Sequence, residues 1–156
     1  MVKISDYLRE NYIKLSLESK EKEAAIKELA EVFRNDQHIK DFSKFMEDVF
    51  EREALGTTGI GLGLALPHAR TDVVDAFVIA VGRSEEGIEF GALDGEPVRL
   101  VFLMATPKAE VQSYLKILAH LTRILKKESF RASLLEAKTP QELIDCFKKE
   151  ESIEVA

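Results

Sequence analysis

Apolar residues at helical spacing predict two helices in the first third of the chain. After Ser19, a suitable N-cap, one apolar face is formed by Ala25, Ile26, Leu29, Ala30 and Phe33. A second stripe is formed by Phe42, Phe45, Met46, Val49 and Phe50. Both follow the spacing of an amphipathic helix, and Asn35-Asp36 separates them. The second helix is expected to end near Leu55, just before Gly56.

The last third of the chain is also expected to be helical. One stripe is formed by Val111, Leu115, Leu118, Leu121 and Leu125, with Tyr114 beside it. Thr139, Pro140 and Glu142 then supply the N-cap, the first-turn proline and the glutamate of a capping box. The helix that they begin is expected to bury Leu143, Ile144 and Phe147.

Four shorter segments predict strands. Residues 13–17 alternate apolar and polar, whereas residues 62–66, 76–81 and 98–105 are continuously apolar, as in strands buried on both faces. A turn is expected at Asp94-Gly95. Because helices precede and follow the cluster of buried strands, the pattern predicts an α/β fold, a three-layer α/β/α sandwich.

Length, charge and cysteine content narrow the class of protein. The 156 residues contain no repeat or low-complexity linker, so residues 1–156 are expected to form a single domain. The net charge of -6 argues against a general nucleic-acid binder, and no apolar run approaches the roughly 20 residues that span a bilayer. The N-terminus lacks an apolar signal core and the single cysteine suits a reducing compartment, so we expect a cytoplasmic protein. No Cys/His cluster has metal-ligand spacing, so no metal is expected.

The candidate chemistry centres on His68. Glycines at positions 59, 61 and 63 lead into an apolar run that Pro67 ends, and His68 follows at once. Histidine titrates near neutral pH, and a neutral imidazole can attack a phosphoryl group. Arg52 and Arg70 are nearby cations suited to phosphate, and glycine N–H groups can approach an anion closely. A lone histidine after a strand is also commonly a surface or hydrogen-bonded residue, so spacing alone leaves its role open.

Nucleotide-binding patterns do not fit the same segment. The glycines form G-x-G-x-G before a strand, whereas the dinucleotide fingerprint follows a strand and opens a helix, and no Gly-Lys-Ser/Thr sequence occurs. No nucleotide cofactor is therefore expected. Thr57 and Thr58 could bind a phosphoryl group or, as loop threonines often do, the local backbone. His38 lies between two predicted helices without an evident chemical neighbour and is interpreted as a surface residue.

Residues 52–61, R-E-A-L-G-T-T-G-I-G, and residues 64–68, L-A-L-P-H, carry a family resemblance. Together they resemble the fructose/mannitol-class IIA domain of the bacterial phosphoenolpyruvate-dependent sugar phosphotransferase system, a class that includes nitrogen-regulatory IIA proteins. Residues 90–98, the strand ending at Pro107 and the leucine helix after it match as well. The resemblance extends from about residue 4 to residue 147 and implies a central mixed sheet between helical layers.

The resemblance also implies roles for the matched residues. His68 would accept phosphate from the phosphocarrier protein HPr, or a paralogue, and pass it to a IIB domain, while Arg52 would steady the phosphoryl group. Thr57, Thr58 and Gly59 are auxiliary phosphate-binding candidates. We expect no IIB or membrane-embedded IIC segment after residue 147. We therefore expect either a stand-alone phosphocarrier or a regulator that binds a target protein, and the sugar cannot be predicted.

The sequence departs from the family at one position. Many members carry a second histidine at the start of the helix after the last strand, and Tyr114 stands there in this chain. A tyrosine hydroxyl can donate to a phosphoryl oxygen or to the His68 ring, but it stays uncharged near pH 7. His120 lies six residues further along the predicted helix and is interpreted as a surface or helix-packing residue. The departure also leaves open a domain without phosphotransfer.

Overall fold

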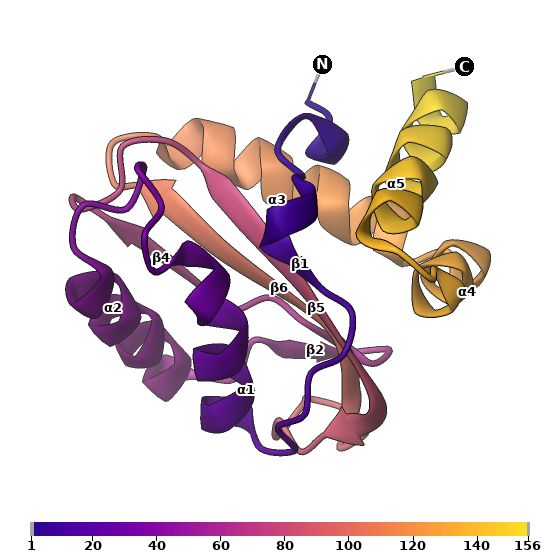
Figure 1. Cartoon of the computed structure of the whole chain (residues 1–156), viewed down its shortest axis with the longest axis horizontal. Helices are drawn as coiled ribbons and strands as arrows, with labels where there is room; N and C mark the ends of the chain where they lie inside the picture. Colours follow the sequence, from indigo (N-terminus) through magenta and orange to yellow (C-terminus); the bar gives the residue numbers. More distant parts are fainter. Residues whose placement is uncertain (1, 156) are drawn as a thin grey trace.

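A mixed sheet of six strands forms the centre of the molecule (Figure 1). The structure, a computed structural model, describes residues 2–155. The strands are β1 (Ile13–Lys14), β2 (Gly59–Gly61), β3 (Leu64–Ala65), β4 (His68–Thr71), β5 (Val78–Ile88) and β6 (Val98–Pro107). Their order is β1-β5-β6-β3-β2, and β4 pairs with β6 beyond β3. The β5–β6 and β2–β3 pairs are antiparallel and the others parallel.

Helices cover both faces of this sheet (Figure 1). The α-helices are α1 (Lys22–Ala30), α2 (Phe42–Leu55), α3 (Val111–Leu125), α4 (Glu128–Glu136) and α5 (Pro140–Val155). Three short 3₁₀ turns are η1 (Ile4–Asp6), η2 (Glu10–Tyr12) and η3 (Glu31–Phe33). The helices α1 and α2 lie on one face, and α3 and α5 lie on the other. The predicted three-layer α/β/α sandwich with a mixed sheet is confirmed.

Two hydrophobic cores explain the continuously apolar central strands. In β5, Ile79 and Val81 enter the core under α3 and α5, whereas Val78 and Ala80 enter the core under α1 and α2. Successive side chains of a strand point to opposite faces, so a strand covered on both faces must be apolar at every position. The prediction for residues 98–105 is confirmed within β6, which is two residues longer.

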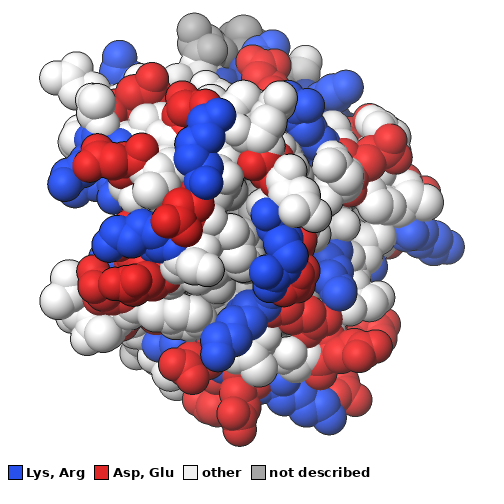
Figure 2. Space-filling model, turned by 60° about the vertical axis from the view of Figure 1, so that its left-hand side comes forward, with Lys and Arg blue, Asp and Glu red and all other residues white. Residues whose placement is uncertain are grey.

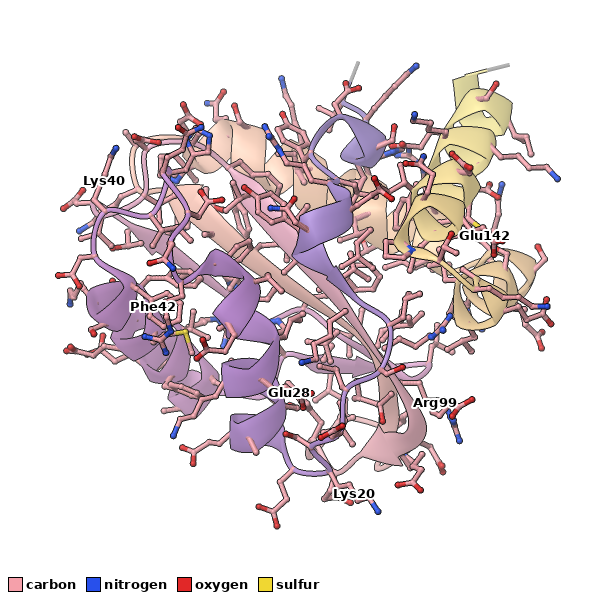
Figure 3. All side chains as sticks on the ribbon, viewed as in Figure 1. Lys20, Glu28, Lys40, Phe42, Arg99 and Glu142 are labelled. Atoms are coloured by element: carbon pink, nitrogen blue, oxygen red, sulfur yellow. The ribbon has the colours of Figure 1, made fainter. Side chains whose placement is uncertain are left out.

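Helix ends were predicted with mixed success. The second helix is confirmed as α2. Thr139 is confirmed as an N-cap, because its Oγ1 accepts the Glu142 N–H at 3.1 Å. The return bond of the predicted capping box differs, since Glu142 Oε2 accepts the N–H of Lys138, one residue before the N-cap, at 2.7 Å. Ser19 is not an N-cap, however: α1 begins at Lys22. The Glu28 carboxylate (Figure 3) accepts the Ser19 N–H at 2.9 Å and so holds that segment outside the helix.

The inward face of α3 also differs from the predicted leucine stripe. Tyr114, Ile117 and Ile124 are buried beside Leu121, whereas Leu115 is 54% exposed. Apolar residues occupy most of the circumference of α3, so periodicity alone could not choose between two adjacent faces. Packing on the sheet selects the face that contains Tyr114, and this places Leu115 at the surface.

The segment around the glycine run is less extended than predicted. Leu62 adopts a left-handed conformation with φ of 59°, between Gly61 and Gly63, which also have positive φ. The expected strand over residues 62–66 is therefore reduced to β3, because a turn occupies its first residues. The strand expected over residues 13–17 is likewise only two residues long, and β2 and β4 were not predicted.

Candidate functional site

The position of His68 follows from its place at the start of β4. It is paired with Met104 of β6, and its Nδ1 lies 2.9 Å from the backbone oxygen of Leu66. A carbonyl oxygen can only accept a hydrogen bond, so Nδ1 carries the ring hydrogen and Nε2 keeps its lone pair. The structure therefore leaves Nε2 as the ring nitrogen with an available lone pair.

The electrostatic surroundings keep this ring neutral near pH 7. Burial lowers the pKa of His68 below its ordinary value, and the positive charges of Arg52 and Arg70 lower it further. The Leu66 hydrogen bond and the charge of Glu53 act in the opposite direction and do not reverse the shift. A neutral ring is the form that can attack an electrophile.

A cleft of about 1250 Å³ opens beside His68, between α2, β4 and the first turn of α3. Its basic lining residues are Lys44, Arg52, Arg70 and Lys108, and its acidic ones are Asp48, Glu51 and Asp72. Figure 2 shows the same mixture over a wider surface, where blue and red side chains intermingle. Of the cations in this cleft, Arg52 and Arg70 act on the His68 ring and lower its pKa, an arrangement suited to a small anion.

Arg52 is held at the end of α2 by its own helix terminus. Its Nη1 donates to the backbone oxygen of Gly56 at 2.9 Å, which occupies one of the five guanidinium N–H groups. Arg52 and His68 both line the cleft. The structure therefore brings the two residues of the predicted site into one cavity, although they belong to different layers of the fold.

Tyr114 packs against the His68 ring. The two ring centroids are 5.4 Å apart and the ring planes are inclined by 37°. Tyr114 is 5% exposed, and burial raises the pKa of its hydroxyl, so the side chain is uncharged near pH 7. Tyr114, one of the predicted auxiliary residues, is thus in direct ring contact with His68.

The other three predicted residues lie outside the cleft lining. Thr58 donates from its hydroxyl to Glu53 Oε1 at 2.5 Å and from its N–H to Glu53 Oε2 at 2.9 Å. Thr57 Oγ1 accepts the Gly59 N–H at 3.0 Å. A Cβ at Gly59 would lie 2.9 Å from the Cα of Ala92, so close backbone approach explains this glycine.

Gly61 and Gly63 shape the turn between β2 and β3. The Leu62 N–H donates to Asp94 Oδ2 at 3.1 Å, and the Gly63 oxygen accepts the N–H groups of Arg99 and Leu100. None of residues 59–63 lines the cleft. We therefore assign the glycine run to the β2–β3 turn and not to an anion cradle.

Some residues of the site were missed or misjudged. Lys108 lines the cleft and directly follows β6, so its position after a strand end was an available signal. The sequence patterns assign no role to Glu53, which is buried and bonded to Thr58. His38 does have a chemical neighbour, because its Nδ1 lies 2.8 Å from Asp75 Oδ1. His120 is buried and bonded through Nε2 to Glu151 at 2.6 Å, in agreement with a helix-packing residue.

Neither a metal-binding cluster nor a membrane-spanning helix occurs among the described residues. Among residues 2–155, no group of His, Cys, Asp and Glu side chains could hold a metal ion. Within the same part of the chain, every helix is too short or too polar to cross a membrane.

Comparison with protein families gives one match that covers most of the chain. Residues 6–150 match the profile of the "Phosphoenolpyruvate-dependent sugar phosphotransferase system, EIIA 2" family. A fructose-specific EIIA component of Haloferax volcanii is 39% identical over 124 residues, which are 80% of each chain.

Two further proteins are similar over nearly the full length of this chain. A fructose-specific EIIABC component of Bacillus subtilis is 39% identical over 144 residues, 92% of this chain but only 23% of that protein. The crystal structure of nitrogen regulatory protein IIA-Ntr from Neisseria meningitidis superposes with a TM-score of 0.86 at 29% identity, over 92% of this chain and 98% of that one.

Proposed function

Because the chain belongs to the EIIA 2 family of the phosphoenolpyruvate-dependent sugar phosphotransferase system, we propose that His68 carries a phosphoryl group on Nε2. IIA domains of this family are phosphotransfer components. The donor is the phosphohistidine of HPr or a paralogue, and the acceptor is a IIB component. The observation that carries the proposal is the 2.9 Å bond between His68 Nδ1 and the Leu66 oxygen, which leaves Nε2 as the nucleophile.

The transfer needs only one bond to form and one to break. The Nε2 lone pair of His68 attacks phosphorus while the P–N bond of the donor breaks, and the electron pair of that bond returns to the donor imidazole. The hydrogen stays on Nδ1, which donates it to the Leu66 oxygen, and the dipole of this carbonyl stabilises the positive charge that develops on the ring. Transfer to IIB reverses these steps, with a IIB nucleophile as the attacking group.

The surrounding residues position and stabilise the phosphoryl group. Arg52, Arg70 and Lys108 from the cleft lining compensate the charge on the equatorial oxygens, which is the main contribution a protein makes to phosphoryl transfer. Tyr114 holds the plane of the imidazole through its ring contact. Thr57, Thr58 and Gly59 act indirectly, by building the loop that supports Leu66.

A protein donor fits the rim of the cleft better than a small molecule does. Leu55, Leu115 and Val111 line the cleft and are 85%, 54% and 37% exposed. Exposed apolar side chains grouped around charged ones are typical of protein contact surfaces. HPr and IIB would then dock in turn over the same rim, in the cytoplasm.

A regulatory role is the second candidate, and the similarity to IIA-Ntr of N. meningitidis favours it. The same phosphorylation of His68 would then switch the binding of a target protein instead of supplying a sugar transporter. The two roles differ in the fate of the phosphoryl group. Rapid transfer to a IIB domain supports the transport role, whereas binding of a target by only one phosphorylation state supports the regulatory role.

The proposal is tested by a transfer assay with labelled phosphoenolpyruvate, enzyme I and HPr. We expect the wild-type chain to be labelled and His68→Ala to remain unlabelled. His38→Ala is the matched control, because His38 is a histidine outside the cleft lining that is paired with Asp75, and it should label like the wild type. Full labelling of His68→Ala would overturn the assignment.

A further inference from the structure

Glu53 is a buried carboxylate one residue away from Arg52. It is 7% exposed, and it accepts hydrogen bonds from the Thr58 N–H at 2.9 Å, the Thr58 hydroxyl at 2.5 Å and Lys22 Nζ at 2.9 Å. A buried charge is costly unless it is paired and hydrogen-bonded. Here α1, α2 and the loop before β2 each contribute to one tightly bonded centre.

Hydrogen bonds connect this centre to the phosphoryl acceptor. The backbone oxygen of Thr58 accepts the Leu66 N–H at 3.0 Å, which extends the β2–β3 pairing beyond the two strands. The Leu66 oxygen in turn lies 2.9 Å from His68 Nδ1. The position of the Leu66 carbonyl, which selects the His68 tautomer, therefore depends on Thr58. The N–H and the hydroxyl of Thr58 are both bonded to Glu53.

We propose that Glu53 is a positioning residue for the phosphoryl acceptor. By fixing Thr58 it fixes the Leu66 carbonyl, and this carbonyl keeps the hydrogen on Nδ1 of His68 and leaves Nε2 for phosphorus. Lys22 contributes from α1 by neutralising the carboxylate. The role rests on the proposed function of His68, but its structural part, the control of the tautomer, can be measured without any phosphoryl transfer.

A purely structural role for Glu53 would have different consequences. If Glu53 only joins α2 to the following loop, its replacement lowers the free energy of unfolding but leaves the His68 tautomer unchanged. Glu151 offers a matched control, since it is 1% exposed and accepts the Ile4 N–H at 2.6 Å and the Ser5 N–H at 3.0 Å. It lies outside the cleft lining.

The test combines NMR with a rate measurement on the full chain. Two-bond ¹H–¹⁵N correlation on protein with labelled histidine rings reports which nitrogen of His68 carries the hydrogen. We expect the Nδ1–H form in the wild type and in Glu151→Gln, and a mixture of both forms in Glu53→Gln. The initial rate of phosphate uptake from phospho-HPr should fall by about tenfold in Glu53→Gln, less than the roughly 100-fold that a 1 Å misplacement can cost, and by under about twofold in Glu151→Gln.

A second variant keeps the test decisive if Glu53→Gln does not fold. Thr58→Val removes only the hydroxyl bond of 2.5 Å and should shift the tautomer and the rate in the same direction by a smaller amount. A wild-type tautomer in the folded variants overturns the positioning role, whatever the rate. If His68 of the wild type takes up no phosphate, the proposed function fails, whereas a tautomer shift in Glu53→Gln would still support the positioning role.

Discussion

Replacing Tyr114 by phenylalanine separates two ways in which this residue can assist His68. The substitution removes the hydroxyl and retains the ring, whose centroid is 5.4 Å from that of His68. A hydrogen bond from the hydroxyl to the charged phosphoryl group would contribute about 1.5–3 kcal/mol, so its loss would slow transfer by about tenfold or more. If Tyr114 acts only through its ring contact, phenylalanine retains that contact. We therefore predict that Tyr114→Phe changes the rate of transfer by less than about threefold.

The companion variant Tyr114→Leu tests the ring itself. Leucine keeps the site apolar but removes an aromatic contact worth about 0.5–1.5 kcal/mol, so the rate should fall by roughly twofold to tenfold. The assay is the initial rate of label uptake from phospho-HPr, with unfolding in urea as a check that each variant is folded. If Tyr114→Phe lowers the initial rate of label uptake by tenfold or more, Tyr114 does not act through its ring alone, and its hydroxyl is a direct ligand of the phosphoryl group.

Three further predictions concern the protonation of His68, the guanidinium of Arg52 and the hydrophobic core around Phe147. Because burial lowers the pKa of His68, its ring should protonate only below the ordinary value of about 6.5. The rate of phosphate acceptance should therefore fall as the pH decreases through that lower pKa. An NMR titration midpoint of His68 at or above about 6.5 would contradict this prediction. Arg52→Met should lower the rate of acceptance by about tenfold or more and Arg52→Lys by less, because lysine keeps the charge without the planar fork; equal initial rates for both variants and the wild type would exclude a phosphoryl contact. Phe147 is fully buried, with its ring centroid 5.0 Å from that of Phe130. Phe147→Ala should therefore lower the free energy of unfolding, measured in urea, by about 3–5 kcal/mol. At 25 °C, where the variant is folded, its rate of phosphate acceptance should change by less than about twofold.

Local patterns made part of the fold predictable. The stripe that includes Phe45 and Val49 has a single apolar face, so it predicted α2 and its buried side correctly. The N-cap at Thr139 was equally predictable, because its hydrogen bond joins residues only three positions apart. The layered architecture followed from the continuously apolar strands, which require a cover on both faces.

Features that depend on long-range pairing were not predictable. Periodicity could not select the Tyr114 face of α3, since the neighbouring face of that helix is apolar as well. The strand β4 was missed because its pairing with residues 104–107, and not its own pattern, makes it a strand. Likewise, Glu53 and His68 are fifteen residues apart in the sequence, and the pairing of Thr58 with Leu66 in the folded chain is what links them through hydrogen bonds.

The proposed function requires Nε2 of His68 to carry the phosphoryl group. The most direct measurement is ³¹P–¹⁵N NMR on protein with ¹⁵N-labelled histidine rings, after incubation with phosphoenolpyruvate, enzyme I and HPr. We expect one P–N bond, at Nε2 of His68, and none at His38 or His120. A phosphoryl group on Nδ1 of His68, or on any other residue, would contradict it.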